Sequence, residues 1–461
     1  MNKHNFTVYE YDRLYVDKEL LLSEKDEEKE KEKLSKDDFK ELRSFILKQE
    51  EGASGSLSLP GLETEEATAC MKLSASKYGQ EILTVQNYVG TIMLSTGTTI
   101  EILPKLFKDD TEERRERARR LVVEMLKACG LITYKSFQNA NLKYEKMPIF
   151  EIYVRIFLNE IFDLYKKGLK SGYELKQENE KFLKGKLLFS QHIKYNFAHA
   201  ERFFVEYDEF SVNRPENRLI KATLERLKRV TQAEENKRDL RRLLMIFEDV
   251  ESSAHIESDF QKCTGGRNMK EYEGILSFCK MFLRGLSYST YAGKHNTLAL
   301  LFPMEKLFEG YIAKKIKDEF APKGWTVKTQ HTGKYLFEEP RMFSLRPDIY
   351  LKKGDDVILM DTKWKLLTDD RAEKYGISQA DMYQMYAYHK RFENVKKVIL
   401  LYPSLLGGNE LHFETDKNAV QIVAKYLQFK NWDFDVKCLA DILEIVQNSQ
   451  NLQNNVNLQQ E

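Results

Sequence analysis

Two aspartates in a short segment of this 461-residue chain have the spacing of a pair that could bind a metal ion together. Two strand-like runs, 348–352 and 357–364, flank a Gly-Asp pair at 354–355. Gly-Asp is favoured in the two-residue loop of a β-hairpin. If that pair forms the loop, Asp348 lies directly opposite Asp361, and facing residues have Cβ atoms about 4.5–5.5 Å apart.

Two facing carboxylates repel each other, by on the order of 4 kcal/mol at about 4 Å near a protein surface. A divalent cation between them reverses that interaction, and Mg²⁺ is held by one or two carboxylates together with water and phosphate oxygens. Strand alternation puts Lys363 on the same face as Asp361, where its ammonium can meet a phosphate or orient a water molecule. The pattern predicts metal-assisted phosphodiester hydrolysis, with Mg²⁺ as the cofactor and Mn²⁺ able to substitute. The alternative is a surface hairpin with scattered charges.

The flanking elements predict how the hairpin is positioned. An amphipathic helix is expected at 304–320 and a strand at 325–330. Ser378 is a good N-cap for a helix over 378–392, which precedes a buried strand at 395–402. A strand, helix, strand connection forms a right-handed crossover to a parallel neighbour. The expected order is therefore α-β-β-β-α-β.

This order and these residues resemble the PD-(D/E)xK nuclease superfamily. Pro347 and Asp348, followed by Asp361, Thr362 and Lys363, stand in the places of its motif. The resemblance implies that Asp348 and Asp361 bind Mg²⁺ and that Lys363 positions the attacking water.

Three further residues match features found in parts of that superfamily. Gln384 and Tyr388 are similar to a Q-x-x-x-Y element, and their spacing puts them on one helix face. The alternative for this pair is ordinary helix packing. Some members add a metal-binding carboxylate from the first helix, a role that Glu309 would take here, with a solvated helix face as the alternative.

Motifs elsewhere in the chain resemble a narrower family, McrC. They are VG at 89–90 with TIEILPKL at 99–106, RPENRLI at 214–220, MEKLFE at 304–309 and ADMYQMYAY at 380–388. Gly185-Lys186 stands where many members have Gly-Arg, a mild departure. The resemblance covers roughly residues 75–405.

The McrC resemblance implies the nuclease subunit of a McrBC-like restriction complex that cleaves methylcytosine-containing DNA with a GTP-hydrolysing AAA+ partner, McrB. It also implies that the N-terminal β region engages that partner and stimulates its GTPase. The chain has no G-x-x-x-x-G-K-[ST] loop, so we expect the partner to bind the GTP. Two alternatives stay open: a non-enzymatic adaptor that activates an AAA+ GTPase, and a standalone nuclease.

The net charge of +1 requires any surface that binds double-stranded DNA to be a local patch. Arg341 and Arg346 beside the hairpin, with Lys365, are the candidate phosphate contacts. Arg346 faces Lys363 in the deduced register, and two facing cations suit a phosphate lying across the strands. The alternative for Arg346 is neutralisation of the acidic pair when metal is absent.

The overall pattern predicts a multidomain α+β protein. We expect an N-terminal β-rich partner-binding domain at 1–107, a central mainly helical region at 108–302, a restriction-endonuclease-like α/β domain at 303–447 and a disordered tail at 448–461. Alternating residues at 71–106 predict hairpins, and 184–196 is expected to be a β-like interruption. Five scattered cysteines and the lack of a membrane-spanning segment predict a cytoplasmic protein.

Overall fold

The computed structural model describes most of the chain. The described residues are 5–16, 33–51, 69–75, 81–108, 111–131, 147–199, 201–263, 270–284, 298–368, 370–408, 410–414, 421–430 and 433–440. The chain divides into two compact units, Met1–Ile132 with Ser287–Glu461, and Thr133–Leu286. The predicted tail at 448–461 lies outside the described residues, and the predicted domain boundaries stay predictions. No described helix is long and apolar enough to cross a bilayer.

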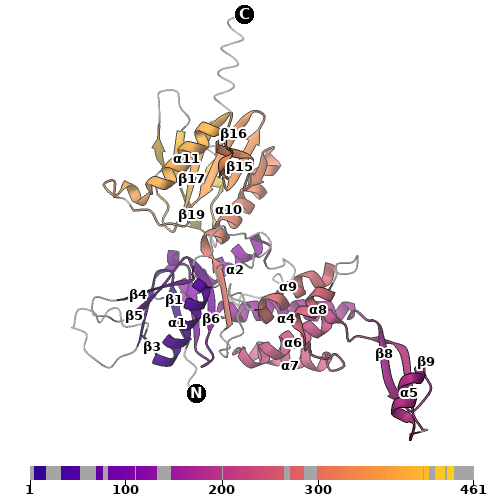
Figure 1. Ribbon diagram of the computed structural model, residues 1–461. Helices are drawn as coiled ribbons and strands as arrows, with labels where there is room; N and C mark the ends of the chain where they lie inside the picture. Colours follow the sequence, from indigo (N-terminus) through magenta and orange to yellow (C-terminus); the bar gives the residue numbers. More distant parts are fainter. Residues whose placement is uncertain are drawn as a thin grey trace, which may run out of the picture. The chain divides into compact units, whose positions relative to one another are not determined.

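Two sheets and a helix make up the N-terminal part of the first unit (Figure 1). One sheet has the order β1-β7-β6-β11 and the other the order β3-β2-β5-β4. Their bounds are β1 (Asn5–Tyr9), β2 (Arg13–Val16), β3 (Lys33–Leu34), β4 (Met71–Ala75), β5 (Glu81–Val85), β6 (Tyr88–Met93), β7 (Thr99–Leu103) and β11 (Leu298–Pro303), with helix α1 at Lys36–Glu51. The antiparallel pairs β4–β5 and β6–β7 confirm the hairpins predicted at 71–106.

The first described segment forms two strands, β1 and β2, although its alternating large residues would suit one continuous strand. The chain turns at Tyr11, whose φ is 69°, so that β1 and β2 enter different sheets. Asp12 stabilises this turn because its Oδ2 accepts the backbone N–H of Tyr9 at 2.7 Å. The short aspartate side chain therefore outweighs the strand preference of the aromatic residues around it.

The C-terminal part of the first unit contains the predicted core. Helix α10 (Met304–Phe320) precedes β12 (Thr326–Thr329), the hairpin of β15 (Ile349–Lys353) and β16 (Asp356–Thr362), helix α11 (Gln379–Arg391) and β17 (Val395–Ser404). Ile349 pairs with Met360 and Lys353 with Asp356, which confirms the deduced hairpin register. Gly354 has a φ of 61°, a conformation that favours glycine at this turn. Strand β17 runs parallel to β16, as the crossover rule predicts.

Several strands add to that expected order. The hairpin of β13 (Lys334–Phe337) and β14 (Met342–Leu345) lies between β12 and β15 in the chain. Strands β18 (Leu411–Phe413), β19 (Gln421–Lys430) and β20 (Asp433–Phe434) follow β17. The main sheet has the order β12-β15-β16-β17-β19-β18, with β20 paired to β19. The structure confirms the α+β class.

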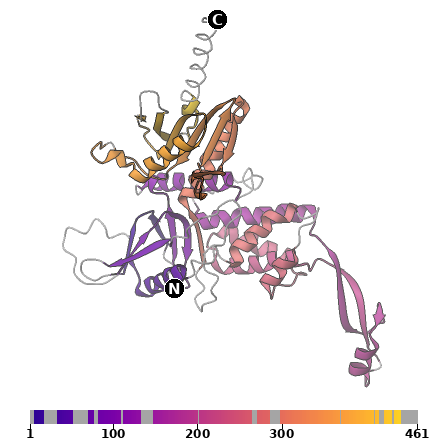
Figure 2. The same ribbon diagram turned by 45° about the horizontal axis from the view of Figure 1, so that its top comes forward.

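The second unit is mainly helical and carries a long hairpin (Figure 2). Its helices are α4 (Ile149–Lys167), α6 (Pro215–Val230), α7 (Glu234–Ile246), α8 (Ile256–Lys262) and α9 (Lys270–Arg284), while α2 (Glu112–Ala128) belongs to the first unit. Strands β8 (Gly172–Glu180) and β10 (Phe203–Ser211) form the hairpin, which we call the arm, with β9 (Lys186–Leu187) and α5 (Phe189–Asn196) at its tip. The β-like interruption predicted at 184–196 is thus mostly helix α5. Helix α5 contacts β10 of the same hairpin. A helix of eight residues is too short to show the periodicity by which a sequence predicts a helix.

Candidate active site

The two aspartates predicted to face each other meet at the open end of the β15–β16 hairpin. Asp348 directly precedes β15, and Asp361 is the last but one residue of β16. The Asp348 Oδ2 atom accepts the Thr362 backbone N–H and the Thr362 hydroxyl, both at 2.7 Å. Asp348 therefore lies alongside the end of β16, and Asp361, 1% exposed, is buried beside it.

Burial and mutual repulsion make these carboxylates costly to ionise. Burial raises the pKa of Asp348 well above its ordinary value, and the charges of Asp361 and Glu309 raise it further. Burial also raises the pKa of Asp361, although Lys363 opposes the rise. For Lys363, burial disfavours the ammonium, but the neighbouring acidic groups, Asp361 first among them, together outweigh burial and raise the pKa. Lys363 is thus a cation in a site with an excess of acidic groups.

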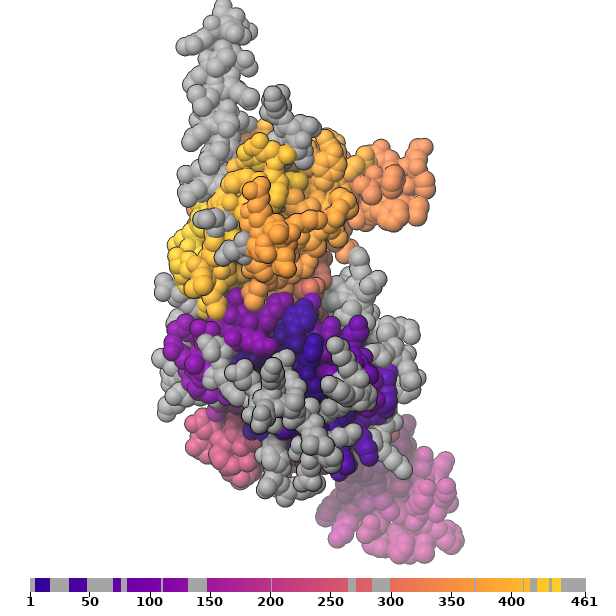
Figure 3. All heavy atoms as spheres, turned by 90° about the vertical axis from the view of Figure 1, so that its left-hand side faces the viewer, coloured from indigo at the N-terminus to yellow at the C-terminus, as the bar shows by residue number. Residues whose placement is uncertain are grey.

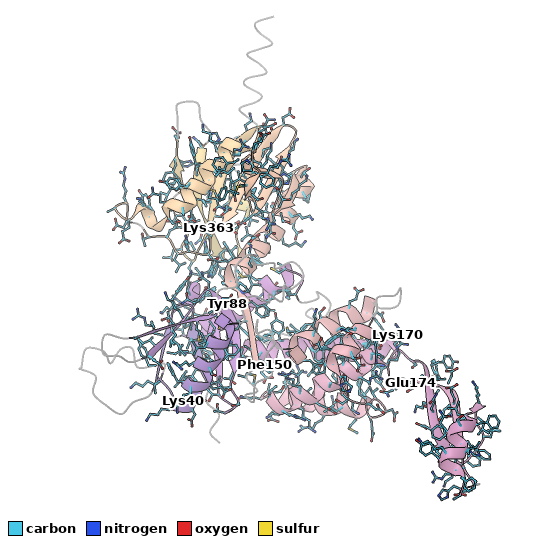
Figure 4. The ribbon with its side chains drawn as sticks, viewed as in Figure 1. Lys40, Tyr88, Phe150, Lys170, Glu174 and Lys363 are labelled. Atoms are coloured by element: carbon cyan, nitrogen blue, oxygen red, sulfur yellow. The ribbon has the colours of Figure 1, made fainter. Side chains whose placement is uncertain are left out.

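Lys363, Gln384 and Tyr388 form one connected group with Asp361. The Lys363 Nζ atom lies 2.6 Å from Asp361 Oδ2 and donates to Gln384 Oε1 at 3.2 Å. The Gln384 amide nitrogen donates to the Tyr388 hydroxyl at 2.7 Å and to Asp361 Oδ1 at 3.4 Å. The Tyr388 hydroxyl donates to the Arg346 carbonyl at 2.9 Å and lies 3.4 Å from Asp361 Oδ1. Helix α11 therefore contributes two side chains to the group that the hairpin begins (Figure 4 labels Lys363).

Glu309 of α10 lies close enough to this group to raise the pKa of both aspartates. It is 8% exposed, so it does not lie on the solvated face that was its alternative. Its carboxylate accepts the Gln330 side-chain amide at 2.7 Å and pairs with Lys306 at 2.9 Å. Its oxygens are thus already satisfied by protein partners.

The metal site that the structure suits is a pair of carboxylates, Asp348 and Asp361, and not a cluster of three or more protein ligands. Among the described residues, no three His, Cys, Asp or Glu side chains gather closely enough to hold a metal ion. The buried Asp361 Oδ2 atom has the Lys363 ammonium 2.6 Å away. A buried carboxylate oxygen beside a second, repelling carboxylate suits a hard cation that keeps several water ligands.

The three predicted DNA contacts differ in their surroundings. Lys365 pairs with Asp381 at 2.8 Å while its side chain stays 42% exposed. Arg346 is exposed next to the site, but strand pairing ends at Ile349, so the predicted facing pair with Lys363 lies beyond the ladder. Arg341 lies in the turn of the β13–β14 hairpin, at the opposite end of β14 from Arg346.

Sequence reasoning missed the residues that hold the site together. Thr362 anchors Asp348, Gln330 holds Glu309, and the buried Asp381 lies 3.9 Å from Lys363. A signal existed for Asp381, which lies three residues before Gln384 and therefore shares its helix face. Gln330 offered no signal, because it follows a short edge strand and meets Glu309 only through the fold.

Removing one charge of the pair should change how the stability of the metal-free protein depends on pH. An acid whose pKa is raised by folding binds more protons in the folded state, so stability falls as pH rises from its unfolded pKa towards the raised value. We expect Asp361→Asn to flatten this decline in EDTA, measured as the free energy of unfolding from pH 4 upward. Asp355→Asn, in the exposed turn, is the control. A decline equally steep in Asp361→Asn and wild type would contradict the raised pKa.

Comparisons with known proteins give the family. No curated protein matches the chain. A chain in the "Refined half-complex from tetradecameric assembly of Thermococcus gammatolerans McrB AAA+ hexamers with bound McrC" is similar in fold, with a TM-score of 0.65, 20% identity and coverage of 93% of this chain and 95% of that one. The "Cryo-EM structure of the Thermococcus gammatolerans McrBC complex" matches with a TM-score of 0.47, 19% identity and coverage of 68% and 87%. The profile of the family "McrBC 5-methylcytosine restriction system component" matches residues 83–403. This match spans more than half of the sequence, and the chain therefore belongs to the McrBC 5-methylcytosine restriction system component family.

Proposed function

We propose that the chain is the Mg²⁺-dependent DNA endonuclease subunit of a McrBC-like restriction complex, cleaving methylcytosine-containing DNA together with an AAA+ GTPase. The observation that carries this proposal is the connected group of Asp348, Asp361, Lys363, Gln384 and Tyr388. The group stands on a restriction-endonuclease-like arrangement, a hairpin followed by a helix and a parallel strand. An adaptor without catalysis has no need for two adjacent carboxylates that repel each other, one of them buried.

In this proposal Asp348 and Asp361 hold the metal ion. Bound Mg²⁺ supplies Lewis-acid stabilisation of the phosphate and lowers the pKa of a water ligand. The Lys363 ammonium, oriented by the Gln384 carbonyl at 3.2 Å, places a positive charge where the scissile phosphate or the attacking water would lie. Gln384 and Tyr388 fix the Asp361 carboxylate from the opposite side.

We propose an AAA+ partner for this chain because its structural relative is described in an assembly of McrB AAA+ hexamers. The resemblance assigns partner binding to the N-terminal β region, and the structure adds the arm as a second candidate. Large apolar side chains on the arm are exposed: Phe182 is 79% exposed, Phe189 69% and Phe197 92%. Exposed apolar surface of this extent is typical of a binding site for another protein.

The composition of the arm's tip favours a binding role as well. Residues 181–199 contain four lysines and no aspartate or glutamate. The arm extends away from the helices of its own unit (Figure 1), and its atoms are the magenta ones at the lower right of Figure 3. A basic, apolar tip on an extended hairpin suits an acidic recess in a partner.

The base of the arm is held firmly. Asn217 is fully buried, and its amide nitrogen donates to the carbonyls of Lys170 at 3.0 Å and Val212 at 2.7 Å. These carbonyls flank β8 and β10, the two strands of the arm (Figure 4 labels Lys170 and Glu174). The Tyr272 hydroxyl donates to Asn217 Oδ1 at 3.0 Å. The RPENRLI motif at 214–220 therefore anchors the arm, and a rigid arm loses little conformational entropy on binding.

Plasmid cleavage distinguishes the three functions. We expect the chain to cut methylated plasmid, but not unmethylated plasmid, when its AAA+ partner, GTP and Mg²⁺ are all present. Stimulation of the partner GTPase without any cleavage would instead support the adaptor. Cleavage that is independent of partner and GTP would support the standalone nuclease.

The salt dependence of DNA binding tests Arg346. Removing a side chain that binds one phosphate lowers the slope of log K against log[salt] by about 0.9 on duplex DNA. We expect Arg346→Ala to weaken binding and flatten this slope, measured by fluorescence anisotropy with a labelled duplex. The same measurement on Arg341→Ala, in the turn of the β13–β14 hairpin, serves as the comparison. An unchanged slope with a shifted Mg²⁺ requirement would favour the neutralising role of Arg346.

A further inference from the structure

Glu10, at the end of a strand of the N-terminal sheet, binds a residue next to the proposed catalytic lysine. It directly follows β1, and its side chain is 1% exposed. The indole N–H of Trp364 donates to its two carboxylate oxygens at 2.8 and 3.1 Å. The backbone N–H of Lys105 donates to the same carboxylate at 2.9 Å, and the Lys105 ammonium donates to the Trp364 carbonyl at 2.7 Å. The N-terminal sheet thus holds Trp364 at both its indole and its backbone.

Trp364 is buried next to residues of the candidate active site. It follows Lys363 in the chain and is 1% exposed. Its ring centroid lies 5.1 Å from that of Phe308, which is fully buried and directly precedes Glu309. A displacement of Trp364 would therefore shift Lys363, its neighbour in the chain. It would also shift Glu309, because Trp364 packs on Phe308.

A second connection joins the same sheet to the helix that carries Glu309. Strand β11 pairs antiparallel with β6 and continues without a loop into α10. The Met304 N–H donates to the Asn87 carbonyl at 2.9 Å, and the Asn87 amide donates to Glu305 at 2.9 Å. The N-terminal sheet and the first helix of the nuclease region are therefore fixed to each other by contacts additional to that of Glu10.

We propose that Glu10 is a positioning residue of the nuclease site, which fixes Lys363 through Trp364 and so lets the N-terminal sheet set the rate of DNA cleavage. This inference rests on the proposed nuclease function. Hydrogen bonds to an ionised acceptor are stronger than neutral ones, so the contact is sensitive to the charge of Glu10. Burial raises the pKa of Glu10 to about 7, although Lys105 lowers it, and Glu305 is the other charged group that acts on it. The contact should therefore weaken as the carboxylate is protonated near neutral pH.

Cleavage kinetics test the positioning role in the full chain with its AAA+ partner, GTP and Mg²⁺. We expect Glu10→Gln to lower the cleavage rate constant by about 10- to 100-fold, since small misplacements of catalytic groups cost that much. The KM for DNA should stay unchanged. Trp364→Phe, which keeps the ring but removes the indole N–H, should have a similar effect. The double variant should be no slower than either single one, because both remove the same contact.

A buried carboxylate elsewhere in the N-terminal region is the matched control. Asp38 is 4% exposed and accepts hydrogen bonds from the Thr96 and Thr98 hydroxyls at 2.5 and 3.1 Å. Asp38→Asn should lower the melting temperature at least as much as Glu10→Gln, yet leave the cleavage rate of the folded protein unchanged. Equal cleavage rates in Glu10→Gln and Asp38→Asn would overturn the inference.

Tryptophan fluorescence tests the contact without any nuclease assay. The chain has three tryptophans, and the difference between wild type and Trp364→Phe isolates the emission of Trp364. We expect this emission to titrate near pH 7 and Glu10→Gln to abolish the titration. A titration that persists in Glu10→Gln would overturn the contact. A wild-type chain that cleaves no DNA but keeps this titration would refute the proposed function, whereas an active chain with an unaffected Glu10→Gln variant would refute only the positioning role.

Discussion

Replacing Asp361 or Lys363 by alanine is expected to lower DNA cleavage at least about 1000-fold while DNA binding and partner binding persist. A bound metal ion contributes several kcal/mol of transition-state stabilisation, and each 1.4 kcal/mol or so changes a rate about tenfold. Asp361→Ala removes a proposed metal ligand, and Lys363→Ala removes the cation that lies 2.6 Å from it. Single-turnover cleavage of methylated DNA, with partner, GTP and saturating Mg²⁺, measures the effect.

Asp348 needs a more conservative variant in the same experiment. Its Oδ2 atom accepts two hydrogen bonds from Thr362, so Asp348→Ala would also leave a buried N–H unsatisfied. Asp348→Asn keeps an acceptor oxygen and should be equally inactive but better folded. Asp355→Ala, in the exposed turn of the same hairpin, should cleave as wild type does. If any two of the alanine variants at Asp348, Asp361 and Lys363 retained full cleavage, the site would be assigned wrongly.

Charging the tip of the arm is expected to reduce stimulation of the partner GTPase to the rate of the partner alone. A buried aromatic anchor contributes about 2 kcal/mol or more to an interface, and Phe189→Asp with Phe197→Asp would remove two of them. Both side chains are exposed in the free chain, at 69% and 92%, so the variant should keep its melting temperature. GTP turnover of the partner, titrated with this double variant, measures the effect.

An equally exposed apolar side chain outside the arm serves as the control. Met245, on α7 of the same unit, is 75% exposed, and Met245→Asp should stimulate the partner as wild type does. Full stimulation by the double variant would exclude the arm. The N-terminal region 1–107 would then remain the element predicted to engage the partner.

Local patterns in the sequence predicted the hairpin register and the helix that lies against Asp361. The Gly-Asp pair fixed the hairpin register through a turn that needs glycine at a positive φ. Ser378 caps α11, accepting the Asp381 N–H at 3.1 Å, and this start places Gln384 and Tyr388 on the face towards Asp361. These features depend on neighbouring residues only, which is why sequence alone revealed them.

The missed features depend on residues far apart in the chain. Glu10 and Trp364 are separated by 354 positions, and neither lies in a local sequence pattern that predicts their contact. The β13–β14 hairpin escaped notice because most of its residues are exposed, so they lack the alternation of a half-buried strand. The turn at Tyr11 depends on Asp12, whose side chain accepts the Tyr9 N–H and whose own N–H donates to the Tyr9 carbonyl at 3.0 Å, and these contacts outweigh the strand preference of the residues around it.

The continuous run from β11 into α10 bears on how the nuclease region could be moved to another protein. Strand β11 covers β6 at the edge of the N-terminal sheet, although some 200 residues separate them in the sequence. A nuclease region excised from Leu298 onward would take β11 with it and leave the edge of β6 uncovered in the donor, and unpaired strand edges promote aggregation. A fragment excised from Met304 onward would instead begin at a helix whose first turn is deprived of the Asn87 carbonyl and amide. A fusion protein that uses this nuclease region should therefore contain the N-terminal sheet as well, so that both chain segments are transferred together.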